Sequence, residues 1–382
     1  MRYFQNPFYL YIITFSLIIF VYSLGWSDLY PELSYSLLFF FGITFVLSII
    51  GGLYLDKHLD ISFKPITNKH SIGLCTLAIY ITYAIEFLYN GGIPIILIFV
   101  DPTYSYIEFG VPTLHPIILT FSSYYTLYLY YLFLSEKKRK TLCYMILLLV
   151  IPILIFNRAM LIFILASMLF LYLVKNRKVS LKIKGKILIG ILLGLFLFGV
   201  AGNYRTVLKN DTSYFMKMME ATPAFSESII PKEYFWGYIY ISSPLATLQY
   251  TLSQIENKNS DDFDEFILGS ILPDFISKRL ASILNVNETS SKYQLNESLN
   301  VGTFYEGAAR YLGWFGLILL YVYMFFFIVI YLLLIRKSPF FLLGLSILSV
   351  MICFNSFTNM FTFSGLCFQL VYPILFSIKL KL

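Results

Sequence analysis

The sequence predicts an all-α protein: a bundle of about ten membrane-spanning helices with both termini in the cytoplasm and one large loop on the outer side. Of the 382 residues, 58% are hydrophobic and only 13% are charged, whereas a soluble domain carries about 25% charged residues. The apolar residues form runs of about the length that a helix needs to cross a bilayer. The basic residues, which give a formal net charge of +7, cluster between those runs.

The predicted spans follow the apolar runs along the chain. A spanning helix needs roughly 20 apolar residues, and ten runs approach this length. The fifth and sixth are short and adjoin at Asn157 and Arg158, so they form either two tilted spans or a broken pair that meets at a shared point. The ten predicted spans are residues 7–24, 34–54, 71–89, 113–134, 142–157, 159–174, 187–204, 311–335, 339–356 and 360–378.

The placement of lysine and arginine predicts the orientation of these spans. With the N-terminus in the cytoplasm, the inner segments hold 18 basic residues, and the short outer loops at 25–33, 90–112 and 357–359 hold none. An excess of basic residues in cytoplasmic loops is typical of membrane proteins. The positive net charge therefore indicates a membrane topology, and we predict no nucleic-acid partner.

Residues 206–310 form the predicted large outer loop, between spans 1–7 in residues 1–205 and spans 8–10 in residues 311–382. This loop carries 13 acidic and 8 basic residues and is the only part outside the spans large enough for a folded subdomain. The acidic stretch 261–265 predicts a helix start, since acids favour a first helical turn. Residues 271–284 continue the apolar periodicity of a helix that would lie along the membrane surface.

Ionisable residues at the outer ends of the spans are the candidates for function. The chain has no P-loop, no dinucleotide-binding glycine motif, no G-x-S-x-G and no H-E-x-x-H, and we predict neither a metal nor a cofactor. An ionisable side chain in lipid costs about 2.5–3.5 kcal/mol on insertion scales, so its presence there favours a functional role.

Three arginines are candidates for binding an anion. Arg158 begins the sixth span, where free N–H groups and the helix dipole favour a phosphate group. Arg205 ends the seventh span after a run of small residues. Arg158 could instead extend to the membrane interface or pair with a carboxylate. Arg310 lies four residues after Glu306, so an ion pair on one helical face is the alternative for these two.

Three further residues are candidates for acid–base chemistry: Glu108, His115 and Glu306. The segment 91–115 is apolar but interrupted by glycine and proline, which predicts a re-entrant or interfacial segment. His115 is the only histidine on the outer side of the predicted topology, and an interfacial anchor is its alternative role. Glu86, inside the third span, is another candidate, for which an interhelical hydrogen bond is the alternative.

Four of these segments, taken in order, resemble the bacterial O-antigen and capsule repeat-unit polymerases of the Wzy type, and the resemblance covers nearly the whole chain. The chain departs from the family's pattern at Tyr311 and Leu312, where members often carry an acidic residue. The four segments are G-G-I-P to E-F-G-V-P-T-L-H (91–115), the isolated Arg158, G-N-Y-R (202–205), and N-V-G-T-F-Y to Y-L-G-W-F-G (300–316).

The resemblance implies a glycosyltransferase at the outer face of the bacterial inner membrane, which polymerises repeat units linked to undecaprenyl pyrophosphate. Its partners would be that lipid-linked oligosaccharide, membrane lipid, a chain-length regulator and a flippase. Arg158 and Arg205 would neutralise the pyrophosphate leaving group, with help from Arg310. Glu108, Glu306 or His115 would orient or deprotonate the acceptor hydroxyl, in place of any metal or cofactor.

Two other functions remain open. An O-antigen ligase shares this architecture but uses a histidine in the large outer loop, and residues 206–310 contain none. A lipid-linked oligosaccharide flippase, or another transporter, usually has more spans, shorter loops and internal symmetry.

Overall fold

The computed structural model is all-helical, which confirms the predicted fold class at that level. Helices make up 75% of the protein, and the described residues contain no strand. The structure describes residues 5–67, 71–101, 104–105, 109–176, 181–207, 214–255, 262–284, 293–296 and 298–377, apart from the side chains of residues 181–184, 187 and 205–207.

Within the described ranges, five helical stretches are long and apolar enough to cross a membrane. They indicate a membrane-associated protein, while the number of ten spans and their orientation remain predictions. The five are Tyr35–His58 (α2), Ile72–Val100, which joins α3 (Ile72–Tyr89) and α4 (Pro94–Val100), Leu114–Glu136 (α5), Arg158–Lys175 (α7) and Glu306–Ile335 (α14).

The other predicted spans are helical but have shorter apolar stretches, which in α8 cover Leu188–Tyr204. Two separate helices meet at the corner formed by residues 155–157, where the fifth and sixth predicted spans adjoin. The tenth predicted span begins late, at Ser364, because residues 355–363 form a turn. It is divided into three short helical pieces. These helices are α1 (Pro7–Tyr22), α6 (Arg139–Leu154), α8 (Leu181–Val207), α15 (Phe341–Phe354), α16 (Ser364–Cys367), η4 (Phe368–Leu370) and α17 (Val371–Leu375).

Asparagine or serine caps several helix starts, which is why the apolar runs begin as helices where they do. The side chain of Asn6 accepts a hydrogen bond from the Phe8 amide at the start of α1, and Ser34 accepts one from Leu37 at the start of α2. Ser71 caps α3 in the same way. These side chains satisfy amides that have no partner inside the helix.

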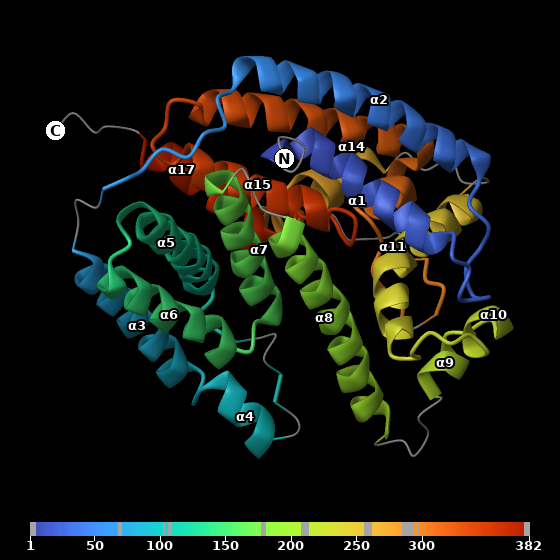
Figure 1. The fold of residues 1–382 in the computed structure, drawn as a ribbon, viewed down its shortest axis with the longest axis horizontal. Helices are drawn as coiled ribbons and strands as arrows, with labels where there is room; N and C mark the ends of the chain where they lie inside the picture. Colours follow the sequence, from blue (N-terminus) through green and yellow to red (C-terminus); the bar gives the residue numbers. More distant parts are fainter. Residues whose placement is uncertain are drawn as a thin grey trace.

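The helices pack as one bundle around a continuous apolar core (Figure 1). Helices α1, α2, α14 and α15 lie side by side, and α7 packs between α15 and α5, which in turn packs on α6. Polar side chains inside this core bond to one another: the hydroxyl of Tyr11 lies 2.7 Å from that of Tyr305 and 3.0 Å from that of Thr44. These three buried hydroxyl groups are thus hydrogen-bonded to one another, as an apolar surrounding requires.

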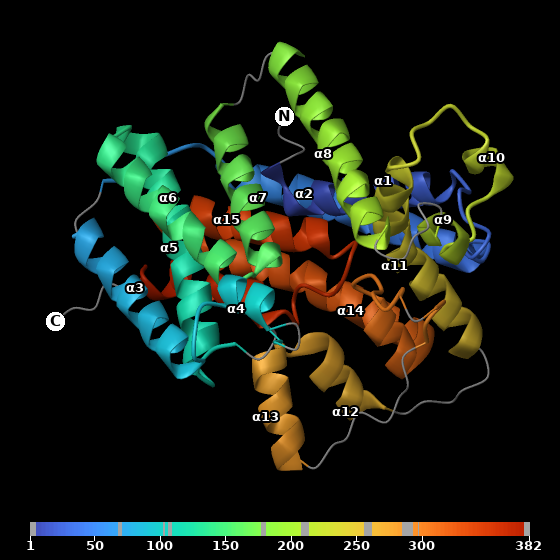
Figure 2. The ribbon, with the colours of Figure 1, turned by 90° about the horizontal axis from the view of Figure 1, so that it is seen from below.

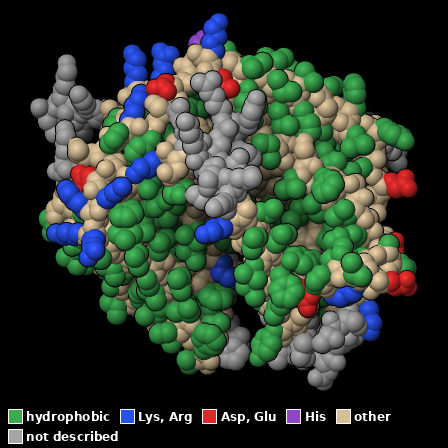
Figure 3. Space-filling view, in the orientation of Figure 1, with side chains coloured by type: hydrophobic (Ala, Val, Ile, Leu, Met, Phe, Trp, Pro, Cys, Tyr) green, Lys and Arg blue, Asp and Glu red, His purple; other side chains and the backbone are tan. Residues whose placement is uncertain are grey.

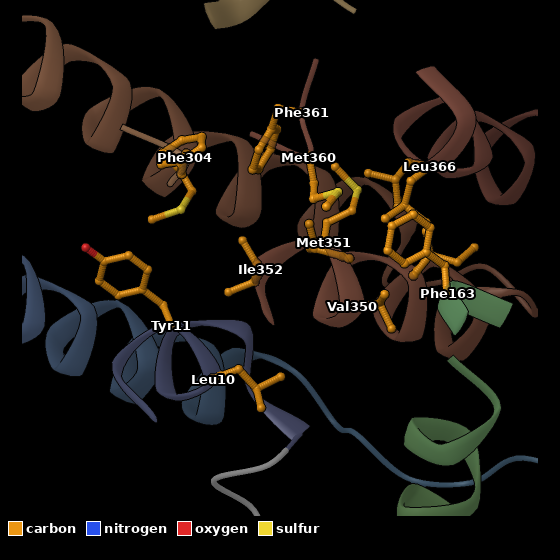
Figure 4. Packing of buried hydrophobic residues seen from close by; sticks show 14 of the residues in the cluster. Leu10, Tyr11, Phe163, Phe304, Val350, Met351, Ile352, Met360, Phe361 and Leu366 are labelled. Carbon is orange, nitrogen blue, oxygen red and sulfur yellow. The ribbon is translucent and has the colours of Figure 1, made fainter. Parts of the chain in front are cut away.

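The turn at residues 355–363 joins several helices at one end of the core. The side chain of Asn355 is fully buried and accepts a hydrogen bond from the Met360 amide at 3.0 Å. The Asn355 carbonyl accepts from the amide of Phe304, just before α14, at 2.7 Å. Figure 4 shows Phe163 of α7 beside Leu366, close to the side chains of this turn. The turn therefore sets the positions of α7, α14 and α15 relative to one another.

The segment predicted as a large outer loop contains a long buried helix, α11 (Tyr234–Ile255), which the sequence analysis does not predict. It packs on α1, α8 and α14. Serine, glutamine and proline lower its hydropathy, so it does not stand out as an apolar run. These residues have structural roles: Gln249 accepts a hydrogen bond from the Ser34 amide at 2.9 Å, and the Pro244 carbonyl accepts one from Thr303 at 3.3 Å.

A second, smaller core lies in residues 206–310, the segment predicted to be outside. Its buried residues include Phe225 and Phe235, and Trp26 and Tyr30 from the loop after α1 pack against it. Burial raises the pKa of Tyr238, whose oxygen accepts a hydrogen bond from the Trp26 amide. The aromatic residues attach the outer segment to the bundle. The short helices here are α9 (Tyr214–Met218), α10 (Pro223–Ser226), α12 (Phe263–Phe266), the π-helix η3 (Ile267–Ile271) and α13 (Asp274–Leu284).

The structure changes the predicted bounds of two helical segments. The predicted helix start at 261–265 is confirmed, since α12 begins at Phe263, but proline at position 273 separates η3 from α13. The eighth predicted span begins five residues earlier than expected, and Gly313 (φ 57°, ψ −140°) kinks it after its first two turns. Glycine tolerates this backbone conformation because it has no Cβ.

Close contact between α8 and α11 generates a prediction about stability. A Cβ at Gly199 would collide with the Glu233 carbonyl, whereas one at Gly190 would meet nothing within 4 Å. We expect Gly199→Ala to lower the free energy of unfolding by about 1–3 kcal/mol through overpacking. Gly190→Ala should be neutral or stabilising by up to about 1 kcal/mol, because alanine favours a helix.

Thermal unfolding of the two purified variants in the same detergent measures this difference. Equal melting temperatures for both would show that α8 and α11 do not touch at Gly199.

Candidate functional site

A buried carboxylate–histidine pair lies at the end of α3. Glu86 has a fully buried side chain, and its Oε2 atom lies 2.9 Å from Nδ1 of His115 in the first turn of α5. The imidazole is 20% exposed, and within the described part of the chain no polar group bonds to its Nε2. A carboxylate that accepts the Nδ1 proton leaves Nε2 as an acceptor. The pair therefore has the geometry of a histidine oriented for proton transfer.

The loop before α5 is shaped around this pair. Gly110 has φ +114°, and a Cβ there would collide with the His115 ring. The Gly110 amide donates to Oδ1 of Asn90 at 3.3 Å, and the Val111 amide donates to Glu86 Oε1 at 3.4 Å. Phe109 packs edge-on against the imidazole, with the ring centroids 5.4 Å apart. The loop encloses Glu86 and leaves one edge of His115 accessible.

Helix α13 joins this loop to the turn that precedes α16. The guanidinium of Arg279 donates to the hydroxyl of Thr113, two residues before His115, at 2.8 Å and stacks on Phe275 at 3.6 Å. At the first turn of α13, the Asp274 carboxylate accepts hydrogen bonds from the amide and hydroxyl of Ser364. Figure 2 shows α13 extending from the bundle beside α12. None of these polar residues is a candidate that the sequence predicts.

The start of α14 packs against η3, the π-helix that precedes α13. Arg310 is buried, with 7% of its surface exposed, and its guanidinium donates to the Tyr311 hydroxyl at 2.9 Å. Tyr311 lies against Gly269, and the side chain of Asn359 donates to the Ser270 carbonyl at 2.8 Å. A π-turn inside a helical segment is frequent at functional sites. Arg310 thus lies inside the protein, whereas the sequence predicts an accessible position at the outer end of the eighth span.

Glu306 and Glu265 are the acidic residues at the same contact between α14 and α12. Glu306 begins α14 and is half-buried, and Glu265 is buried on α12. Glu306 is a predicted candidate base, whereas the position of Glu265 in an acidic run of the sequence indicates only a helix start. The structure thus brings Glu306 and Arg310 to one cluster and His115 to another, with η3 and α13 between them.

Arg158 is exposed at the first residue of α7. Asn157 caps the helix by accepting from the Met160 amide at 3.1 Å, and the guanidinium lies 5.1 Å from the centre of the Phe156 ring. Figure 3 shows the surface hollowed between α7 and α8, with basic side chains in the hollow. Arg158 lies in the predicted outer half of α7, and Arg205 lies in the predicted outer half of α8.

Two nominated residues lie wholly or partly outside the described structure. Glu108 is not among the described residues, and Arg205 belongs to α8 but its side chain is not described. Among the described residues, no group of three or more histidine, cysteine, aspartate and glutamate side chains could hold a metal ion.

Comparison of the chain with known protein families, with curated proteins and with solved structures finds no match in any of the three. The resemblance to the repeat-unit polymerases therefore rests on the sequence motifs alone.

The contact between Arg279 and Thr113 generates a prediction about the His115 loop. We expect Arg279→Ala to speed amide exchange in residues 109–115 about fivefold, because the loop loses a hydrogen bond worth about 1 kcal/mol. Lys278→Ala removes the same charge from the neighbouring residue and should leave exchange in the loop unchanged.

Hydrogen–deuterium exchange with mass spectrometry on the purified protein makes the comparison. The same exchange rates in both variants would mean that α13 does not hold the loop.

Proposed function

We propose that the protein is a membrane glycosyltransferase that polymerises oligosaccharide repeat units carried on a polyprenyl diphosphate, at the outer face of a bacterial inner membrane. The observation that carries the proposal is the pairing of Glu86 with His115 in a helical protein of this apolar composition. Burying ionisable groups in such a protein costs free energy, so the presence of the pair favours a functional role. The family is inferred from the sequence motifs, which resemble those of the repeat-unit polymerases.

In the proposed reaction, His115 acts as the general base. The hydroxyl oxygen of the acceptor sugar attacks C1 of the donor sugar and forms the new glycosidic bond. The bond from C1 to the diphosphate oxygen breaks, and the diphosphate leaves with the electron pair. Nε2 of His115 takes the hydroxyl proton, and Glu86 stabilises the imidazolium that results. Glu108 and Glu306 are the other candidates for orienting the acceptor.

Arginine side chains neutralise the leaving diphosphate in this proposal. Arg158 begins α7 and Arg205 lies near the end of α8, and a guanidinium binds phosphate oxygens in a bidentate manner. The free amides at the start of α7 add a favourable dipole. Arg310, which is buried against Tyr311, has the role of supporting the site from inside the protein.

Deletion and complementation test the function. We expect a strain without the gene to lose every surface-polysaccharide band longer than one repeat unit on a gel. Loss of the single-repeat band as well would indicate a flippase or a ligase instead. His115→Asn and Arg158→Ala should each fail to restore the long chains, whereas Arg139→Ala, an exposed arginine at the start of α6, should restore them.

The position of the imidazole can be tested without removing it. Gly110→Ala introduces a methyl group that collides with His115, so we expect polymerisation to fall at least a hundredfold, the usual contribution of a general base. Gly91→Ala is the matched control, because Gly91 also has a positive φ (75°) but no atom within 4 Å of its Cβ position.

Polymer yield per unit of membrane-inserted protein is the measurement for both variants. Equal yields would exclude His115 as the base.

A further inference from the structure

A pocket of about 400 Å³ lies in the outer segment, apart from the Glu86–His115 pair. It is formed by α9, α11 and residues 298–301. Trp236 forms part of its wall, stacks on Phe215 with ring centroids 3.5 Å apart, and donates through Nε1 to Asn203 of α8 at 2.7 Å. Asn203 lies two residues before Arg205. The pocket is thus next to the outer end of α8.

The lining is largely apolar and also carries aromatic rings and uncharged polar groups; its apolar members include Phe215, Met218, Met219, Ile239, Leu299, Val301 and Phe357. Tyr214 and Tyr240 join Trp236, and Ser243 and Asn300 supply a hydroxyl and an amide. Tyr240 is 44% exposed, and its ring packs edge-on against Phe198 at 4.8 Å. Among the described lining residues, none is charged.

This lining favours one class of ligand. An anion would require basic side chains, and an acyl or prenyl chain would make no hydrogen bond to the exposed side chains of Ser298 and Asn300. A sugar ring has apolar C–H faces that pack on aromatic rings and hydroxyl groups at its edge for serine and asparagine. The volume lies within the range of small-molecule sites, about 300–1,000 Å³.

We propose that this pocket binds uncharged sugar units of the glycan chain, as a subsite separate from the reacting groups. The inference rests on the proposed function, which supplies a glycan at this face of the bundle. The exposed Tyr240 ring stacks on a sugar face, and Asn300 bonds to its hydroxyl groups. A chain held here stays beside the end of α8 while repeat units are added.

Titration calorimetry on the full-length protein in nanodiscs tests the subsite. The probe is the oligosaccharide released by mild acid from the host's own surface polysaccharide. We expect Tyr240→Ala to weaken binding about tenfold, a loss of about 1.4 kcal/mol, and Asn300→Ala to weaken it several-fold. Tyr35→Ala is the matched control, because Tyr35 is a tyrosine with 91% exposure that lies outside the pocket.

Several results would overturn the subsite. These are absence of binding to the wild-type protein, unchanged binding in folded Tyr240→Ala and Asn300→Ala, an equal loss in Tyr35→Ala, or displacement of the sugar by farnesol. The proposed function fails separately: it fails when deletion of the gene leaves the polysaccharide ladder unchanged. A ladder that depends on the gene, together with unchanged binding in both pocket variants, rejects the subsite alone.

Discussion

The turn at residues 355–363, together with Ser364 at the start of α16, is the constraint on which the rest of the structure depends. Its polar groups find their partners inside the protein. Asn355 bonds within the turn and to the segment before α14, and Asn359 bonds to η3. Ser364 bonds to Asp274 of α13. In an apolar medium each unpaired group would cost several kcal/mol, so the helices that meet at this turn are held in one arrangement.

The candidate site follows from that arrangement. Because η3 and α13 are tied to the turn, α13 brings Arg279 to Thr113 and so determines how the His115 loop closes over Glu86. The carboxylate and the imidazole come from α3 and α5, which pack together. The pair is thus positioned both by helix packing and by a polar connection from the outer segment.

Much of the fold could be predicted from the sequence, because the apolar runs mark the helices. The capped starts at Asn6, Ser34 and Asn157 agree with the predicted runs to within a few residues. Helix α11 could not be found in this way, since its serine, glutamine and proline residues find partners only in the folded protein. His115 could be nominated as an isolated ionisable group. Its partner Glu86 was open to two roles, because the two residues are 29 positions apart.

The kink at Gly313 separates the first two turns of α14 from the apolar stretch that follows. A spanning helix adapts to the thickness of the lipid around it by tilting. In α14 such a tilt can be taken up at the non-helical residue, while the short segment that carries Glu306 and Arg310 stays against η3. We therefore expect the geometry of this cluster to change little when the lipid composition alters the slope of the longer segment.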